Sequence, residues 1–135
     1  MKITGTFDVS LEPMDTYTKG VEGNNLGRMS INKRFHGELS AESKGEMLSV
    51  MSSVKGSAGY VAIEQVSGSL SGKSGHFILQ HFGVMESGQD KLILEVVPNS
   101  GTSDLTGLTG KMKIRIENGQ HYYDFEYSGV YTHDT

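Results

Sequence analysis

The amino-acid sequence predicts an all-β fold, an eight-stranded antiparallel up-and-down barrel. Apolar and polar residues alternate with period two in one segment after another, which is the pattern of half-buried strands. The 135-residue chain has 18 glycines and 2 prolines, and glycine weakens helices while it permits tight turns. Several alternating segments are long, and an open sheet of such strands would leave two bare edges, so closure into a barrel is expected. A β-sandwich is the structural alternative.

Eight segments carry the alternation. They lie at residues 2–10, 28–39, 44–54, 58–70, 74–85, 90–98, 110–117 and 120–131. Short turn sequences such as Lys55-Gly56-Ser57, Glu86-Ser87-Gly88-Gln89 and Asn118-Gly119 separate consecutive segments. Because these residues accept positive φ, neighbouring strands should form hairpins. Residues 11–27 interrupt the pattern with Pro13 and a Gly/Asn cluster, and we expect a loop or lid across one end.

The parity of each strand assigns one of its faces to the interior. The inward sets are Ile31, Lys33, Phe35, Gly37 and Leu39; Tyr60, Ala62, Glu64, Val66, Gly68 and Leu70; Phe77, Leu79, His81 and Gly83; Met112, Ile114 and Ile116; and Tyr123, Phe125 and Tyr127. Residues 44–54 and 90–98 are apolar on both faces, so their outer face needs a cover as well. Either a homo-oligomer, with a dimer favoured, or a lid segment or terminus would supply that cover.

Composition limits the partners and the compartment. The chain should form a single domain over residues 1–135. The formal net charge is -4 and the basic residues are scattered, which argues against nucleic acid as a partner. There is no cysteine, so no disulfide or thiol mechanism is expected, as in a reducing compartment. The first residues lack the apolar stretch of a signal peptide, and no run has membrane-spanning length. We expect a cytoplasmic protein without a membrane partner.

Three titratable residues, Lys33, Glu64 and His81, stand on otherwise apolar inward faces. A buried charge is costly unless it is paired, so these side chains should meet one another or be kept for a ligand. Glu64 and His81 lie on adjacent strands and form a plausible acid–base pair, which makes them the candidate catalytic residues. Tyr60 and Tyr123 add hydroxyl groups to the same predicted lining. The alternative is a satisfied buried network that only fixes the register.

Two other motifs do not predict a site. Gly68-Ser-Leu-Ser-Gly72-Lys73-Ser74 resembles a phosphate-binding loop, but its spacing is one residue short and a strand follows where a helix must begin. A hairpin turn is the better interpretation. The only conceivable metal ligand set is His81, His121 and Glu64, and we expect neither a metal nor another cofactor.

Three motifs carry a family resemblance. They are Gly68-x-Leu70-x-Gly72-x-x-Gly75-x-Phe77-x-Leu79-x-His81-x-Gly83, VVPNSGTSDLTGLTG at residues 96–110, and His121-Tyr122-Tyr123-Asp124-Phe125-Glu126-Tyr127. Together they resemble a bacterial family of small proteins of unknown function whose fold is similar to the allene oxide cyclase barrel. The glycine-rich part of the second motif is also similar to a barrel-rim signature of plant allene oxide cyclases and dirigent proteins. The chain departs from the bacterial family's pattern at Asn99, where glycine is expected.

The resemblance implies an allene oxide cyclase-like, calycin-like barrel but no activity, because fold analogy alone transmits none. Residues 96–110 should then form a rim element that closes one end, shaping the backbone rather than filling the core, with Asp104 as a local cap or turn residue.

Three functions remain as hypotheses. The first is a binding protein for a small, mostly apolar molecule in the lumen, oriented by Lys33, Tyr60, Glu64, His81 and Tyr123. The second is an isomerase or cyclase in which Glu64 or His81 moves a proton. The third is a packed barrel that acts through a protein-interaction surface.

Overall fold

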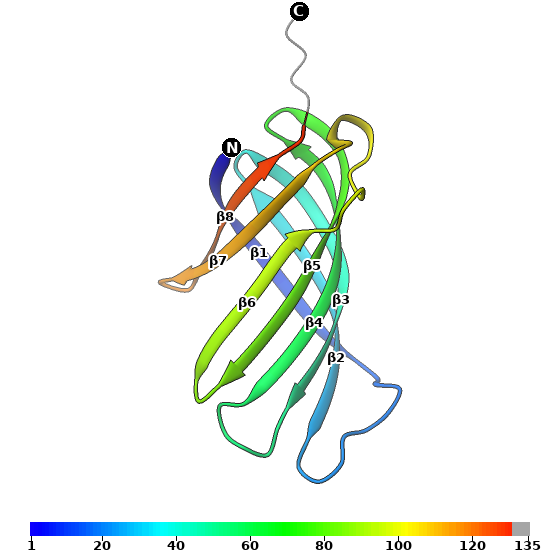
Figure 1. Ribbon diagram of the computed structural model, residues 1–135, viewed down its shortest axis with the longest axis vertical. Coiled ribbons are helices and arrows are strands. Elements are labelled where there is room, and N and C mark those ends of the chain that lie inside the picture. Colours follow the sequence, from blue (N-terminus) through cyan, green and yellow to red (C-terminus); the bar gives the residue numbers. More distant parts are fainter. Residues whose placement is uncertain (131–135) are drawn as a thin grey trace, which may run out of the picture.

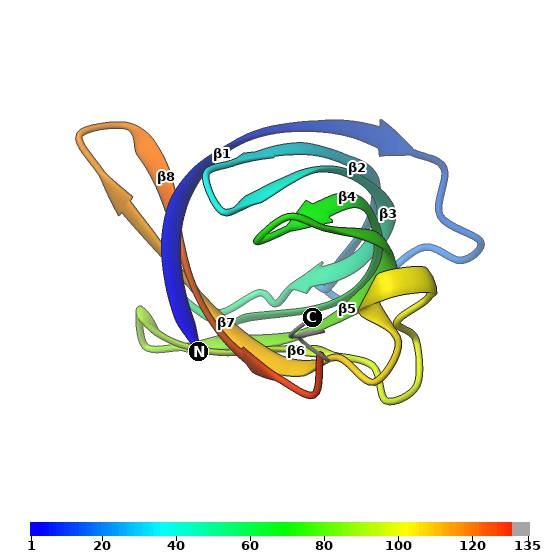
Figure 2. The same ribbon diagram turned by 90° about the horizontal axis from the view of Figure 1, so that it is seen from above.

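A computed structural model describes residues 1–130 and confirms the predicted fold class. Its strands are β1 (Lys2–Met14), β2 (Asn25–His36), β3 (Leu39–Met51), β4 (Ala58–Leu70), β5 (Lys73–Glu86), β6 (Gln89–Val96), β7 (Thr109–Glu117) and β8 (Gln120–Ser128). Each strand pairs antiparallel with the next, and β8 pairs with β1, so the sheet closes into a barrel (Figures 1 and 2). A short 3-10 helix, η1 (Ser103–Leu105), lies between β6 and β7.

The connection between β1 and β2 is shorter than predicted. β1 continues through Pro13 to Met14 and β2 begins at Asn25, so the expected loop at 11–27 shrinks to residues 15–24. Beyond Phe7, β1 pairs with β2 but no longer with β8, and proline is tolerated in such an edge position. The loop projects away from the side of the barrel in both views (Figures 1 and 2), so the expectation of a lid across one end is wrong.

Other strand boundaries differ by a few residues. The predicted segment 28–39 is divided at Gly37, whose φ of 113° makes the turn into β3, so Leu39 begins the next strand. The predicted last strand, 120–131, ends at Ser128, and position 131 lies outside the described residues. Within residues 1–130, no helix is long and apolar enough to cross a membrane.

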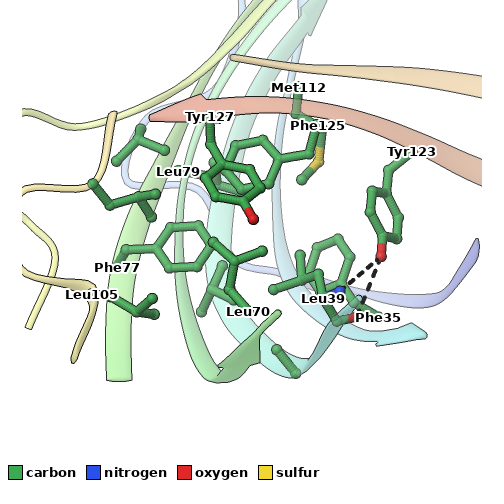
Figure 3. Close-up of a cluster of buried hydrophobic side chains, with 14 of the residues drawn as sticks. Phe35, Leu39, Leu70, Phe77, Leu79, Leu105, Met112, Tyr123, Phe125 and Tyr127 are labelled. Carbon is green, nitrogen blue, oxygen red and sulfur yellow. Dashed lines mark hydrogen bonds between the residues drawn. The ribbon is translucent and has the colours of Figure 1, made fainter. Parts of the chain in front are cut away.

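Apolar side chains fill the upper half of the barrel, as oriented in Figure 1. Aromatic and leucine side chains from opposite walls pack together there (Figure 3). The rim segment between β6 and β7 adds Leu105 and Leu108, which are 0% and 1% exposed. This segment therefore shapes the rim, as expected, but it also fills the core, because its two leucines enter the barrel end. A side chain on Gly75 of β5 would collide with the carbonyl oxygen of Thr102, so glycine permits this close approach.

The lower half of the barrel is open along one side. Among the described residues, β6 and β7 pair only at Glu95 and Lys111, and the β1–β8 pairing ends at Phe7 and His121. The β7–β8 hairpin then swings away from the barrel (Figure 2). Below that level, strands β1 to β6 form a curved sheet, and side chains on its inner face are exposed, among them Met51, Met85 and Leu92 at 64%, 40% and 36%.

Candidate functional site

The three titratable residues that parity places inside the barrel lie together at the boundary between its packed and open halves. Glu64 of β4 is at the centre and is 0% exposed. Its Oε2 lies 3.1 Å from Nζ of Lys33 on β2 and 2.6 Å from Nε2 of His81 on β5. Lys33 also lies against aromatic rings, with Nζ 5.0 Å from the ring centre of Phe7. The antiparallel ladder thus brings the side chains of three strands to one point.

Ser43 completes this cluster and was missed by the sequence reasoning. Its hydroxyl donates to Oε1 of Glu64 at 2.7 Å. Ser43 and Lys33 are Cα partners across β2 and β3, so both side chains point inward from neighbouring positions. Parity could have revealed it, because Ser43 is two residues from both Ala41 and Gly45 and therefore points to the same, inward side of the strand. A polar residue on an inward face, opposite a predicted buried lysine, indicates a hydrogen-bond partner.

The cluster keeps Glu64 ionised. Burial by itself raises the pKa of the Glu64 carboxyl, but the hydrogen bond from His81, the charge of Lys33 and the hydrogen bond from Ser43 outweigh it and lower the pKa to about 2. All buried polar side-chain atoms among the described residues have partners. Glu64 is therefore a fixed anion, sealed from solvent, and it neutralises the positive charge of Lys33 beside it.

His81 links Glu64 to Tyr60 of β4. Because an ionised carboxylate only accepts hydrogen bonds, Nε2 of His81 carries the proton that it donates to Glu64. Nδ1 of His81 lies 3.1 Å from the hydroxyl oxygen of Tyr60. In the neutral imidazole, Nδ1 accepts the phenolic proton, which leaves the Tyr60 oxygen free to accept a hydrogen bond from elsewhere. Burial and the charge of Glu64 raise the pKa of Tyr60, so it remains a phenol at neutral pH.

Tyr60 lies on the wall of a cavity in the open lower half. The cavity has a volume of about 470 Å³. Its lining is mostly apolar and includes Met47, Met51, Tyr60, Met85, Leu92 and Ile114, with Asp90 and Lys91 as its charged residues. Gly83 of β5 makes room for the Tyr60 ring, because a side chain at this position would collide with ring carbon Cε1. The result is an apolar chamber with a chain of hydrogen bonds leading from Tyr60 into the barrel wall.

Comparison with known proteins places the chain in a family. A family model described as a protein of unknown function (DUF3224) matches residues 3–127. The chain belongs to the DUF3224 family. A crystal structure of another member, a protein with unknown function from Shewanella oneidensis MR-1, is 60% identical and has a TM-score of 0.94, over 98% of each chain. A search of curated proteins found no match. The resemblance inferred from the three motifs is therefore confirmed.

The DUF3224 barrel does not bring Tyr123 to this cavity. The side chain is 0% exposed and lies in the packed upper half (Figure 3). Its hydroxyl donates to the carbonyl oxygen of His36 at 2.9 Å and accepts from the backbone N–H of Leu39 at 3.2 Å. These bonds hold the β2–β3 turn against β8. Parity correctly predicted that Tyr123 points inward. Parity says nothing about the position of a side chain along the barrel axis, and Tyr123 is not part of the candidate site.

The remaining motifs of this DUF3224 chain have structural roles. His121 packs on the ring of Phe7, with ring centres 5.1 Å apart. Within the described part of the chain, no three or more His, Cys, Asp or Glu side chains are grouped so as to hold a metal ion. The stretch that resembles a phosphate-binding loop is the β4–β5 hairpin turn at Ser71 and Gly72, followed by strand β5.

Proposed function

We propose that this DUF3224 protein binds a small, neutral, mostly apolar molecule in the lower cavity, with Tyr60 as its polar contact. The observation that supports it is a mostly apolar cavity of about 470 Å³ whose wall holds the hydrogen-bonded chain from Tyr60 through His81 to Glu64. Ligand sites have volumes of roughly 300–1,000 Å³ and are mostly apolar with a few placed polar groups. The third hypothesis assumes a barrel that is packed with side chains throughout, which fits only the upper half.

The hydrogen-bond chain favours a particular class of ligand. When His81 is a neutral imidazole that donates from Nε2 to Glu64, Tyr60 donates its proton to Nδ1. The phenolic oxygen is then available as an acceptor and suits the O–H of an alcohol or the N–H of an amine. A carboxylate is disfavoured, because the negative charge of Glu64 acts on Tyr60 and contributes to its raised pKa. Lys33 cannot compensate, since its ammonium group is held by Glu64, and the positive charge of Lys91 on the cavity lining is offset by the adjacent Asp90. Lys33, Glu64 and His81 therefore support Tyr60 and do not touch the ligand.

A fluorescent probe tests the proposal. N-phenyl-1-naphthylamine is neutral and apolar and carries one N–H donor, so its fluorescence should rise on binding. Leu92→Trp, which fills the chamber, should abolish this rise, whereas Tyr60→Phe should weaken binding by about 5–10-fold through loss of one hydrogen bond. The matched control is Ile93→Trp, because Ile93 is the next residue of β6 but lies on the outer face.

Competition distinguishes the ligand class. 1-Decanol should displace the probe at a lower concentration than decanoate, which has the same chain length but a negative charge. The proposal fails if the probe does not bind, or if Leu92→Trp and Ile93→Trp reduce binding equally.

Proton transfer is the second candidate function, and the Tyr60–His81–Glu64 chain is the observation that favours it. Tyr60 would take an α-proton from a bound ketone while its phenolic proton passes to Nδ1 of His81, and Glu64 would stabilise the imidazolium that forms. Glu64 cannot act directly, because it is sealed and its pKa of about 2 is far from neutrality. Tyr60 would be the catalytic residue, with His81 and Glu64 positioning it.

Hydrogen exchange into a ketone tests the second function. The protein should accelerate deuterium exchange at the α-carbons of 2-decanone in D₂O, followed by proton NMR, and Tyr60→Phe should remove the acceleration. Exchange no faster than in buffer would exclude this activity for ketones while leaving the binding proposal intact.

A further inference from the structure

The outer wall of the barrel carries an apolar face that spans four strands. In register, Leu48 of β3 lies opposite Val61 of β4, Val61 opposite Phe82 of β5, and Phe82 opposite Ile93 of β6. Ile63 and Val84 widen this row. We call these six residues the outer apolar face. Their exposed fractions lie between 41% and 54%, so each is half in contact with its neighbours and half in water.

The outer apolar face is large for a surface that stays in water. Six side chains with this exposure present roughly 500 Å² of apolar area, comparable to the largest patch on a typical monomer, which is often functional. Tyr17 of the β1–β2 loop stands beside it with its side chain fully exposed, at 105% of the reference area. Tyr17, Leu48, Val61 and Phe82 line one groove. Tyrosine adds on the order of 200 Å² when it is buried.

Together these areas come to about 700 Å², close to the roughly 800 Å² per partner of a standard-size interface. A fully exposed aromatic side chain next to an apolar face is suited to reach across an interface, where tyrosines are enriched and often dominate the binding energy. A surface of this size and composition is typical of contact with a folded protein rather than with a single small molecule.

The charges at the border of the outer apolar face favour a second copy of the chain as the partner. The six residues carry no charge, and the border holds both signs: Arg28 pairs with Glu46 at 2.5 Å on the β2–β3 side, and Lys91 and Glu95 flank Ile93 on β6. A strongly basic partner would be repelled by the two positive side chains of this border, and a strongly acidic partner by the two negative ones. In a two-fold symmetric pair, the β6 border of one face would lie over the β2–β3 border of the other. Each border carries one positive and one negative side chain, so opposite charges can meet.

We propose that the protein forms a two-fold symmetric homodimer through the outer apolar face, with Tyr17 of each protomer packed on the face of the other. The buried surface would come from the β3–β6 wall and the β1–β2 loop. The lower cavity lies on the inner side of the same wall, so the dimer leaves its opening between β6 and β7 free. This inference is independent of the proposed ligand.

Sedimentation and light scattering test the dimer. The wild-type chain should have about twice its monomer mass of 14.7 kDa. Phe82→Glu and Val61→Lys place a charge in the centre of the interface and should each raise the dimer dissociation constant at least about 100-fold. The control is Ile116→Lys, because Ile116 is 66% exposed on the β7–β8 hairpin, away from the outer apolar face. It should leave the dimer unchanged.

Circular dichroism and thermal melting of each variant show whether its barrel is folded. Because the substituted side chains are half exposed, both monomeric variants should retain the β spectrum. A wild-type chain that stays monomeric at about 100 μM, far above the dissociation constants of specific interfaces of this size, overturns the proposal. So does a folded Phe82→Glu variant that dimerises as tightly as the wild type. A monomeric wild type that binds phosphatidylcholine vesicles would assign the face to a lipid surface instead.

Discussion

Replacing Glu64 with glutamine should lower the free energy of unfolding by about 3–5 kcal/mol, the range for breaking a buried ion pair. Glutamine has nearly the same shape but no charge, so Lys33, whose side chain is 5% exposed, loses its counterion. One terminal atom of the amide is an N–H donor, so the hydrogen bond with Ser43 must reverse its direction if the amide oxygen is to keep those from Lys33 and His81. Urea denaturation followed by circular dichroism measures the change.

Two further variants isolate the cause. The double variant Lys33→Met/Glu64→Gln removes the orphaned cation and should recover a large part of the loss, because apolar replacement of a buried pair is often neutral. Glu46→Gln is the matched control, since Glu46 forms an ion pair with Arg28 at the surface, where pairs contribute about 0–1 kcal/mol. Equal effects at Glu46 and Glu64 would contradict the structural role given to the buried cluster.

Acidification should remove a comparable amount of stability through the same residue. The folded-state pKa of Glu64 is about 2, below the ordinary value of 4.5, so the ionised form is preferred in the folded protein. This contribution is fully present above about pH 5 and is lost as the pH falls from 4.5 towards 2. The difference of the two pKa values corresponds to about 3 kcal/mol.

Unfolding free energies of the wild type and of Glu64→Gln, measured by urea denaturation between pH 5 and pH 2, test this linkage. The other carboxyl groups titrate in both proteins, so the difference between the two curves reports Glu64. It should shrink by about 3 kcal/mol towards pH 2. Parallel curves would show that the Glu64 carboxyl has the same pKa in the folded and unfolded chains.

Alternation predicted the strands and most of the inward residues because the side-chain period of a strand is two and one face of each strand is buried. The prediction was wrong for Ile116, which is 66% exposed because the β7–β8 hairpin swings away from the barrel. The same rule placed Lys33, Glu64 and His81 inside. Their meeting at one point depends also on register, which brings Glu64 opposite Gly45 on one side and Leu79 on the other. Register is set by the turns, and hairpins such as Ser71-Gly72 were readable from the sequence.

The features that the sequence did not predict depend on height and closure rather than on parity. Tyr123 and Tyr60 both face inward, yet one lies in the packed half and the other at the open cavity. The separation of β6 from β7 below Glu95 could not be predicted locally. β7 keeps its alternation beyond the last pair, and β6 is apolar on both faces whether or not it is paired. Pro13 suggested a loop, but it is accommodated where β1 is an edge strand, and that edge exists only because the barrel opens there.

The central claim is that the open lower half of the barrel receives a small neutral ligand, and NMR of the methionine methyl groups tests it most directly. Met47, Met51 and Met85 line the cavity, whereas Met112 is buried in the core and Met14 lies at the end of β1. Titration with 1-decanol should shift the methyl signals of the first three and leave those of Met14 and Met112 in place. Unchanged signals from the three cavity methionines at a saturating concentration of 1-decanol would contradict the claim.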